Sequence, residues 1–167
     1  MRVLAIDPAV RNTGYAVLEG DAQRQVLVCY DVITIPKMIV QSAALAAVRL
    51  HLVHVIEQYQ PDEVAVEGII YVQSHQTAIS MGAARAATLI AAADRGLPVY
   101  EYSPKKVKMA VVGNGNADKA QVAYMVRALL GLQETPPADA ADALAIAIAH
   151  FQASDPRRQH LLDRRLI

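Results

Sequence analysis

The chain has 167 residues, of which 16 are basic and 16 are acidic, so its formal net charge is zero. This length fits one domain, and a composition that is 54% hydrophobic and 19% charged excludes a disordered chain. The single cysteine, Cys29, excludes an intramolecular disulfide framework and a cysteine-based zinc site.

Three strands are predicted at the start of the chain. Apolar runs rich in strand-forming residues occupy 2–7, 15–20 and 25–35. The turn after the first run contains Pro8 and Gly14, which interrupt regular structure. Strands joined by such short connections form an antiparallel meander.

Helices and strands alternate in the rest of the chain. Apolar residues recur at helical spacing over 38–59, and Pro61 ends this pattern. Ser103 followed by Pro104 is typical of a helix start. The remaining elements are predicted as strands at 62–68 and 99–102, a helix at 76–94, a helix from Ser103, a helix at 117–131 and a last helix from Ala138.

This order predicts an α/β fold with a five-stranded mixed sheet flanked by helices. Three antiparallel strands come first and two parallel strands follow. We expect residues 1–153 to form the domain and residues 154–167 to be a basic tail that is loosely held. In such sheets, functional sites gather at the carboxyl ends of the strands.

Four acidic residues fall at the ends of predicted elements. Asp7 ends the first strand, Glu67 ends the fourth, and Asp139 and Asp142 share one face of the last helix. Carboxylates on rigid elements suit Mg²⁺ or Mn²⁺, and two such ions about 3.5–4 Å apart can clamp both reacting oxygens of a phosphodiester. Each acid alone is also explained as a turn residue, a solvated strand end or a helix-capping residue.

Six segments resemble the RuvC family of bacterial Holliday-junction resolvases, whose fold is ribonuclease H-like. The last of them is highly specific, because it places two acids at fixed spacing in an otherwise apolar helix. The segments are AIDPAVRNTGYAV (5–17), VAVEG (64–68), MGAARA (81–86), LPVYEYSPKKVKMAVVGNGNADKAQV (97–122), MVRALLGL (125–132) and ADAADALAIAIAH (138–150).

The resemblance implies a homodimeric, Mg²⁺-dependent endonuclease of DNA recombination and repair. Such an enzyme nicks two strands of like polarity in a four-way DNA junction. The resemblance places the family's catalytic and metal-holding acids at Asp7, Glu67, Asp139 and Asp142. It implies that these acids bind two Mg²⁺ ions, with Mn²⁺ as an alternative. Junction DNA and a branch-migration motor complex, RuvA and RuvB, are the implied partners.

Three positions depart from the family's usual pattern. Ala5 and Ala9 stand where the family usually has glycine, and Ala9 adds a methyl group near the expected metal pocket. Ile70 stands where an aromatic ring usually stacks at the junction crossover. Either Tyr71 supplies this stacking, or junction distortion is weaker here, or Tyr71 is an ordinary loop residue.

Basic residues concentrate in one segment, residues 102–130, which holds five basic residues against Asp118 alone. The resemblance places Lys108 and Lys119 near the scissile phosphate or the DNA backbone. The full set of candidate DNA contacts is Lys105, Lys106, Lys108, Lys119, Arg85, Ile70 and Tyr71. A solvated helix face explains the basic residues equally simply. The helix that carries Arg85 is rich in small residues, and the resemblance makes it a candidate dimer interface.

The sequence therefore predicts a Holliday-junction resolvase and leaves two alternatives open. One is a catalytically weak or silent junction-binding module, which Ala5, Ala9 and Ile70 keep open, and the other is a related nuclease acting on flaps or RNA. We expect a soluble cytoplasmic protein, because the start lacks the apolar run of a signal peptide and the uncharged residues 68–84 are too polar to span a membrane.

Overall fold

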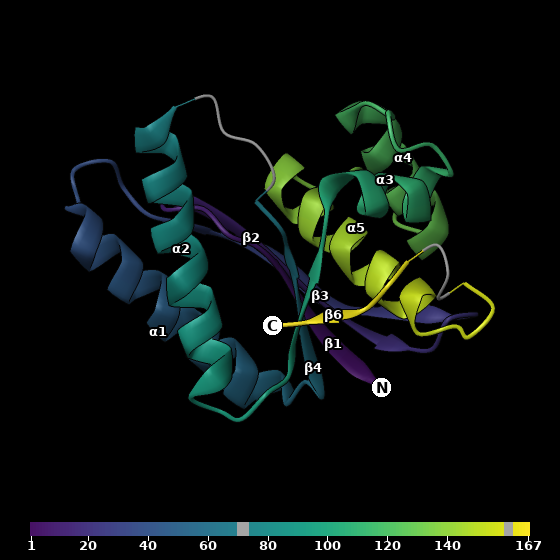
Figure 1. The fold of residues 1–167 in the computed structure, drawn as a ribbon, viewed down its shortest axis with the longest axis horizontal. Coiled ribbons are helices and arrows are strands. Elements are labelled where there is room, and N and C mark those ends of the chain that lie inside the picture. The colour runs from purple at the N-terminus through teal and green to yellow at the C-terminus, as the bar shows by residue number, and fades with distance from the viewer. Residues whose placement is uncertain (70–73, 159–161) are drawn as a thin grey trace.

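The computed structural model describes residues 1–69, 74–158 and 162–167. A six-stranded sheet lies between two layers of helices (Figure 1), with its strands in the order β3-β2-β1-β4-β5-β6. The strands are β1 (Arg2–Asp7), β2 (Asn12–Gly20), β3 (Gln25–Thr34), β4 (Glu63–Glu67), β5 (Val99–Tyr102) and β6 (Arg165–Leu166). The helices are α1 (Gln41–Tyr59), α2 (His75–Ala93), α3 (Pro104–Val112), α4 (Lys119–Leu130) and α5 (Ala138–Ala153).

The predicted mixed sheet is confirmed. Strands β1, β2 and β3 pair antiparallel, and β4 and β5 continue the sheet in parallel from β1. Strand β2 begins at Asn12 and not at Tyr15, because Asn12 and Gly14 already pair with Thr34 and Val32 of β3. The sixth strand, β6, was not predicted; it pairs antiparallel with the edge of β5.

The period of two along each strand divides the sheet into two apolar cores. On β1, Leu4 and Ile6 pack in the core that contains α1 and α2. Val3 and Ala5 pack in the core that contains α3, α4 and α5. Figure 1 shows these two helix groups on opposite faces of the sheet. None of the helices described combines the length and the apolar character needed to cross a membrane.

Helix α5 lies against the middle of the sheet and is buried along nearly its whole length. Its many alanines allow a close approach to β1 and β2. At its first turn, the approach depends on Gly14 of β2, because a Cβ atom there would lie 1.9 Å from the carbonyl oxygen of Asp139. Gly14 pairs with Asp7 of β1, so this glycine brings the start of α5 next to the end of β1.

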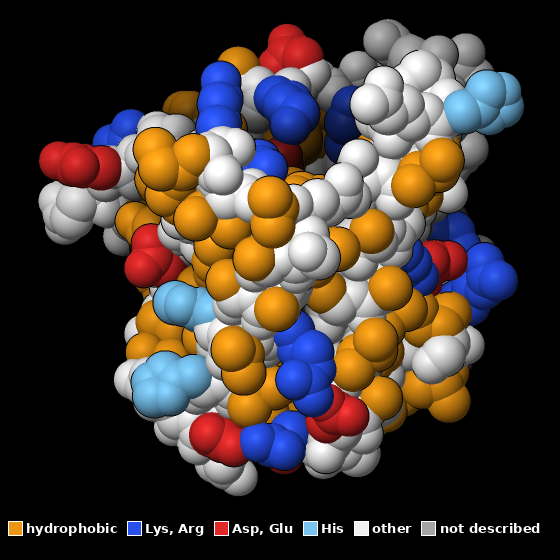
Figure 2. Space-filling view, turned by 90° about the vertical axis from the view of Figure 1, so that its left-hand side faces the viewer, with side chains coloured by type: hydrophobic (Ala, Val, Ile, Leu, Met, Phe, Trp, Pro, Cys, Tyr) orange, Lys and Arg blue, Asp and Glu red, His pale blue; other side chains and the backbone are white. Residues whose placement is uncertain are grey.

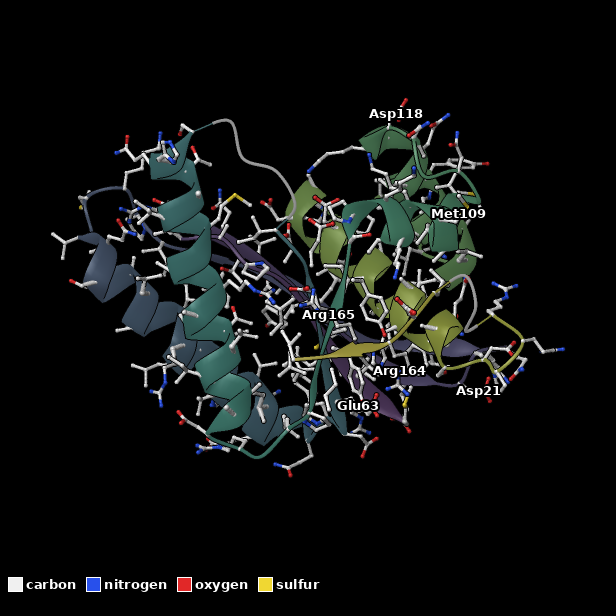
Figure 3. All side chains as sticks on the ribbon, viewed as in Figure 1. Asp21, Glu63, Met109, Asp118, Arg164 and Arg165 are labelled. Atoms are coloured by element: carbon white, nitrogen blue, oxygen red, sulfur yellow. The ribbon has the colours of Figure 1, made fainter. Side chains whose placement is uncertain are left out.

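The end of the chain packs on the sheet and is not the loosely held tail that we expected. Arg164 pairs with Glu63 at the start of β4, and its guanidinium lies 4.2 Å from the centre of the Tyr100 ring. Figure 3 labels Arg164 and Glu63 near each other beside β6. Glu63 also accepts from the buried His150 of α5, across 2.7 Å. Local sequence patterns could not predict these contacts, because they join residues that are far apart in the chain, 101 positions in the case of Arg164 and Glu63.

Candidate active site

The four predicted acids lie around the carboxyl ends of two adjacent strands. Asp7 continues the side-chain alternation of Val3 and Ala5, so it faces the side of the sheet that α5 covers. Glu67 is likewise two residues after Ala65, on the parallel neighbour β4. The start of α5 approaches the same edge, with Asp139 in its first turn and Asp142 in the next.

Burial and neighbouring carboxylates change the acidity of Asp7. Its pKa rises from the usual 3.8 to about 7, first because burial disfavours the charged form. The carboxylates of Glu67, Asp142 and Asp139 raise the pKa further by repulsion, whereas the ammonium of Lys119 lowers it. The other three acids thus all lie within electrostatic reach of Asp7.

Glu67 is perturbed in the same direction. Burial, followed by repulsion from Asp142, raises its pKa from 4.5 to about 7. Lys119 and Lys108 lower the pKa of Glu67 through their positive charges. Two carboxyl groups that titrate near neutrality beside further acids form a site that favours a positively charged ligand.

The ammonium of Lys119 serves as a cation beside these acids. Its Nζ donates a hydrogen bond to Oδ2 of Asp142 across 2.7 Å, although the lysine side chain is 77% exposed. This hydrogen bond, opposed by partial burial and helped by the charges of Asp142, Asp7 and Glu67, raises the pKa of Lys119. A positive group therefore already lies where the negative charge is concentrated.

The donor chemistry of the site fits a hard divalent cation. All four side chains offer carboxylate oxygens, which Mg²⁺ and Mn²⁺ prefer, and the Lys119 ammonium marks the place where a cation is stabilised. In the described part of the chain, no three His, Cys, Asp or Glu side chains converge closely enough to hold a metal ion as they stand. Binding of a metal ion by these acids would therefore require their side chains to move closer together.

Two grooves lie next to the acids. The first, which we call the basic groove, has a volume of about 450 Å³ and is lined by Glu67, Gly68, Ile69, Met81, Pro104, Lys105, Lys108, Gly115 and Asn116. The second, the Asp139 groove, has a volume of about 470 Å³ and is lined by Ala9, Val10, Arg11, Asn12, Gln41, Ser80, Met81 and Asp139. A smaller cavity of about 170 Å³ contains Lys108 and Lys119 with Glu67 and Asp142.

The other candidate DNA contacts have different surroundings. Lys106 donates to Asp163 of the chain end across 2.8 Å. Arg85 pairs with Glu101 and donates to the backbone carbonyl of Glu67 across 3.0 Å. Ile70 and Tyr71 lie outside the described residues.

Ala9 needs no glycine-like backbone. Among the residues described, Gln60 is the one non-glycine residue with a positive φ, so Ala9 and Ala5 adopt ordinary conformations. The backbone N–H of Ala9 donates to Thr13 Oγ1 across 3.2 Å, and the Thr13 hydroxyl donates back to the Ala9 carbonyl. The turn after Asp7 is thus held by Thr13 and tolerates alanine.

The sequence alone did not identify Glu101 and Arg11 as residues near the site, and it did not reveal the steric role of Gly14. Glu101 carried one usable signal, because a charged residue inside the short strand VYEY needs a partner for its carboxylate. Arg11 gave no such signal. Its guanidinium is oriented by donating to the carbonyl of Pro36 across 2.9 Å, a contact that depends on the tertiary fold.

Comparisons with known proteins agree with this geometry. A family model described as "Crossover junction endodeoxyribonuclease RuvC" matches residues 3–150. A protein of that name from Akkermansia muciniphila is 59% identical over 167 residues and the full length of both chains. One from Dehalococcoides mccartyi is 47% identical over 151 residues, or 90% of each chain.

Solved structures show the same likeness. The structure titled "T. thermophilus RuvC in complex with Holliday junction substrate" superposes with a TM-score of 0.90 and 34% identity, covering 100% of this chain and 99% of that one. The yeast mitochondrial Holliday junction resolvase Ydc2 has a TM-score of 0.64 at 14% identity, covering 96% of this chain and 84% of that one. This second likeness concerns the fold alone.

Proposed function

The chain belongs to the RuvC family of crossover junction endodeoxyribonucleases, and we propose that it resolves Holliday junctions by metal-assisted phosphodiester hydrolysis at its four acids. The observation that carries this proposal is the position of Asp7 and Glu67 at the carboxyl ends of the adjacent strands β1 and β4, beside the start of α5, which carries Asp139 and Asp142. Residues 1–153 are the nuclease domain in this proposal, and residues 154–167 are its C-terminal extension.

We propose that the four carboxylates bind two Mg²⁺ ions, with Mn²⁺ as an alternative. When bound, such ions polarise the scissile phosphate and acidify the attacking water. The acids hold this charge in place, and the strand ends beneath Asp7 and Glu67 keep their backbones fixed. One of the acids orients the attacking water, and hydrolysis leaves a 5′-phosphate and a 3′-hydroxyl at each nick.

Lys119 and Lys108 have distinct roles in this proposal. Lys119 neutralises Asp142 in the free protein. Its long, exposed side chain is free to turn toward a DNA phosphate once another cation satisfies Asp142. Lys108 lies in the basic groove and in the cavity with Glu67, so it is placed to bind the phosphate next to the scissile bond.

The two grooves suggest a path for the strand that is cut. The basic groove includes Glu67, the Asp139 groove includes Asp139, and Met81 lines both grooves. We propose that one side of the strand follows Lys105 and Lys108 and that the other side passes Arg11. A guanidinium held by the Pro36 carbonyl keeps further donors available for a phosphate.

A homodimer would supply two active sites for two strands, and a two-fold axis would give them matching geometry. Figure 2 looks onto the side of the molecule formed by α1 and α2, where hydrophobic side chains gather at the surface. Leu50 of α1 and Ile79 and Ile90 of α2 are exposed in the single chain. We propose this side as the dimer interface and RuvA and RuvB as further partners.

The decisive experiment compares cleavage of a mobile four-way junction, a flap and an RNA–DNA hybrid in Mg²⁺. The proposal expects paired nicks in junction strands of like polarity and little cleavage of the other two substrates. Preferred cleavage of flaps or hybrids would favour the related-nuclease alternative. Tight junction binding without cleavage in either Mg²⁺ or Mn²⁺ would favour the binding-module alternative.

A further inference from the structure

The backbone of Glu67 is held by a side chain from the neighbouring helix. Nη1 of Arg85, on α2, donates to the Glu67 carbonyl oxygen across 3.0 Å. The other end of the same guanidinium forms an ion pair with Glu101 of β5. Both side chains are largely covered, with 15% of Arg85 and 17% of Glu101 exposed. Arg85 thus joins α2, β4 and β5 at the residue that ends β4.

Glu101 supports this arrangement from the adjacent strand. Its carboxyl group packs against Gly68, where a Cβ atom would lie only 3.0 Å from Glu101 Cδ. Its second carboxylate oxygen accepts a hydrogen bond from Arg165 Nη1 across 3.1 Å. Arg165 belongs to β6, and Figure 3 shows it on that strand across the sheet edge. The contacts therefore run from β6 through Glu101 and Arg85 to Glu67.

The position of Glu67 makes this support necessary. Pairing of β1 with β4 ends at Val66, and pairing of β4 with β5 ends at Glu67 and Tyr102. Beyond them, the N–H of Gly68 donates to the Tyr102 carbonyl across 2.8 Å. Glu67 also lies among other carboxylates, whose repulsion favours displacement of its side chain. A backbone fixed at this point limits how far the carboxylate can move.

We propose that Arg85 and Glu101 are positioning residues for Glu67, with Arg165 of the C-terminal strand as their outer support. This inference rests on the proposed function for its catalytic consequence. It gives the strand β6, which lies beyond the matched residues 3–150, a part in preparing the active site. Arg85 acts through Glu67 and need not contact DNA.

The test compares Arg85→Ala, Glu101→Gln and Arg165→Ala with the matched control Arg2→Ala. Arg2 also pairs with a glutamate, Glu19, and donates to a backbone carbonyl, that of Tyr59, but it lies at the opposite end of β1 from Asp7. The first readout is Mn²⁺ binding to the DNA-free protein, measured by titration calorimetry or by the electron paramagnetic resonance of free Mn²⁺. The second is the single-turnover rate of junction cleavage as Mg²⁺ is varied, and the third is the salt dependence of junction binding in Ca²⁺.

We expect Arg85→Ala and Glu101→Gln to lower Mn²⁺ affinity or the cleavage rate about 10- to 100-fold, the usual effect of losing a support for a metal ligand. Arg165→Ala should have a smaller effect, because its side chain is 73% exposed. Arg85→Lys should recover part of the loss, because a lysine retains the charge. Junction affinity and its salt dependence should match the wild type in all variants, and Arg2→Ala should be silent.

Wild-type Mn²⁺ affinity and cleavage in both Arg85→Ala and Glu101→Gln would overturn the proposal. A salt slope lowered by about one in Arg85→Ala, with unchanged Mn²⁺ affinity, would instead identify Arg85 as a phosphate contact. If Arg85→Ala does not fold, the result for Glu101→Gln tests the proposal, because glutamine keeps the shape of the glutamate side chain. If the proposed function is wrong, the wild type will bind Mn²⁺ but will not cleave junctions. In that case, the Mn²⁺ affinities of the variants and the wild type still test whether Arg85 and Glu101 position Glu67.

Discussion

Lys119 Nζ lies 2.7 Å from Asp142 Oδ2, so a lysine of α4 neutralises an acid of α5 at the edge where Asp7 and Glu67 also end their strands. This ion pair offsets the repulsion among the neighbouring carboxylates in the absence of a metal ion. It also places a mobile ammonium next to the proposed position of the scissile phosphate. In the proposed site, a divalent cation would compete with Lys119 for Asp142.

Replacement of the lysines tests this relationship. Lys119→Ala and Lys108→Ala should each weaken junction binding or slow cleavage, and each should lower the salt slope of binding by about one if it contacts a phosphate. Fluorescence anisotropy at several salt concentrations and single-turnover cleavage measure these effects. Arg24→Ala, at the exposed turn between β2 and β3, is the control and should change neither. Unchanged junction affinity, salt slope and cleavage rate in both lysine variants would indicate that the basic residues of 102–130 only form a solvent-exposed face.

The four acids should be individually essential for cleavage. Asp7→Asn, Glu67→Gln, Asp139→Asn and Asp142→Asn preserve side-chain shape but bind a divalent cation poorly, so each should abolish nicking and leave junction binding intact. Single-turnover assays with a labelled junction measure the rate, and a gel-shift assay measures binding. Glu134→Gln changes an exposed loop acid in the same way and should cleave normally. Any acid whose amide variant nicks at the wild-type rate does not belong to the site.

The raised pKa values of Asp7 and Glu67 predict how stability depends on pH. Between the unfolded values of 3.8 and 4.5 and the folded values of about 7, the folded chain holds protons that the unfolded chain has released. The free energy of unfolding of the metal-free protein therefore decreases as pH rises through this window. Above the window, these two groups cause no further decrease.

Glu67→Gln and Asp7→Asn remove this penalty, so each should be more stable than the wild type at pH 7.5, with the difference shrinking toward pH 4. Urea unfolding in the presence of a chelator gives the comparison at each pH. Mg²⁺ or Mn²⁺ should raise the stability of the wild type more than that of either variant. A stability difference that does not vary with pH would contradict the assigned pKa shifts.

Gly14 should be required for the approach of α5. A Cβ atom at this position would lie 1.9 Å from the Asp139 carbonyl oxygen, so Gly14→Ala must displace the first turn of α5. Overpacking of this kind costs about 1–3 kcal/mol of stability, and the displaced Asp139 and Asp142 should lose cleavage activity. Thermal unfolding and cleavage assays measure the two effects. Normal thermal unfolding and normal cleavage in Gly14→Ala would argue against the contact.

The loop after Glu67 gives a prediction that rests on the sequence. If Tyr71 supplies the stacking ring, Tyr71→Ala should lose about 1–3 kcal/mol of stacking and slow cleavage, whereas Tyr71→Phe should be nearly silent. If Ile70 acts as an apolar wedge between base steps, Ile70→Ala should cause the loss instead. Single-turnover rates and the fluorescence of 2-aminopurine at the crossover distinguish the two. Normal cleavage rates and normal 2-aminopurine fluorescence in both alanine variants would show that neither residue opens the junction at the crossover.

The sequence predicted the elements that rest on local patterns. The continuous apolar runs of β1 and β4, and the apolar helix that begins at Ala138, placed Asp7, Glu67, Asp139 and Asp142 at the ends of rigid elements. Ser103 was correctly predicted as a helix cap, since its hydroxyl accepts from the Lys106 N–H. These features follow from periodicity and capping, which depend on residues within a few positions of one another.

The tertiary structure alone decided which distant residues support the acids. The contact of Gly14 with Asp139, the ion pair of Arg85 with Glu101, and the attachment of the chain end through Arg164 and Glu63 join residues far apart in the sequence. No local periodicity encodes such a contact, because it exists only after the sheet brings the strand ends and helices together. The sequence by itself therefore identified the four candidate carboxylates, and the packing of α5, α2 and β6 determined how the elements that carry them are held.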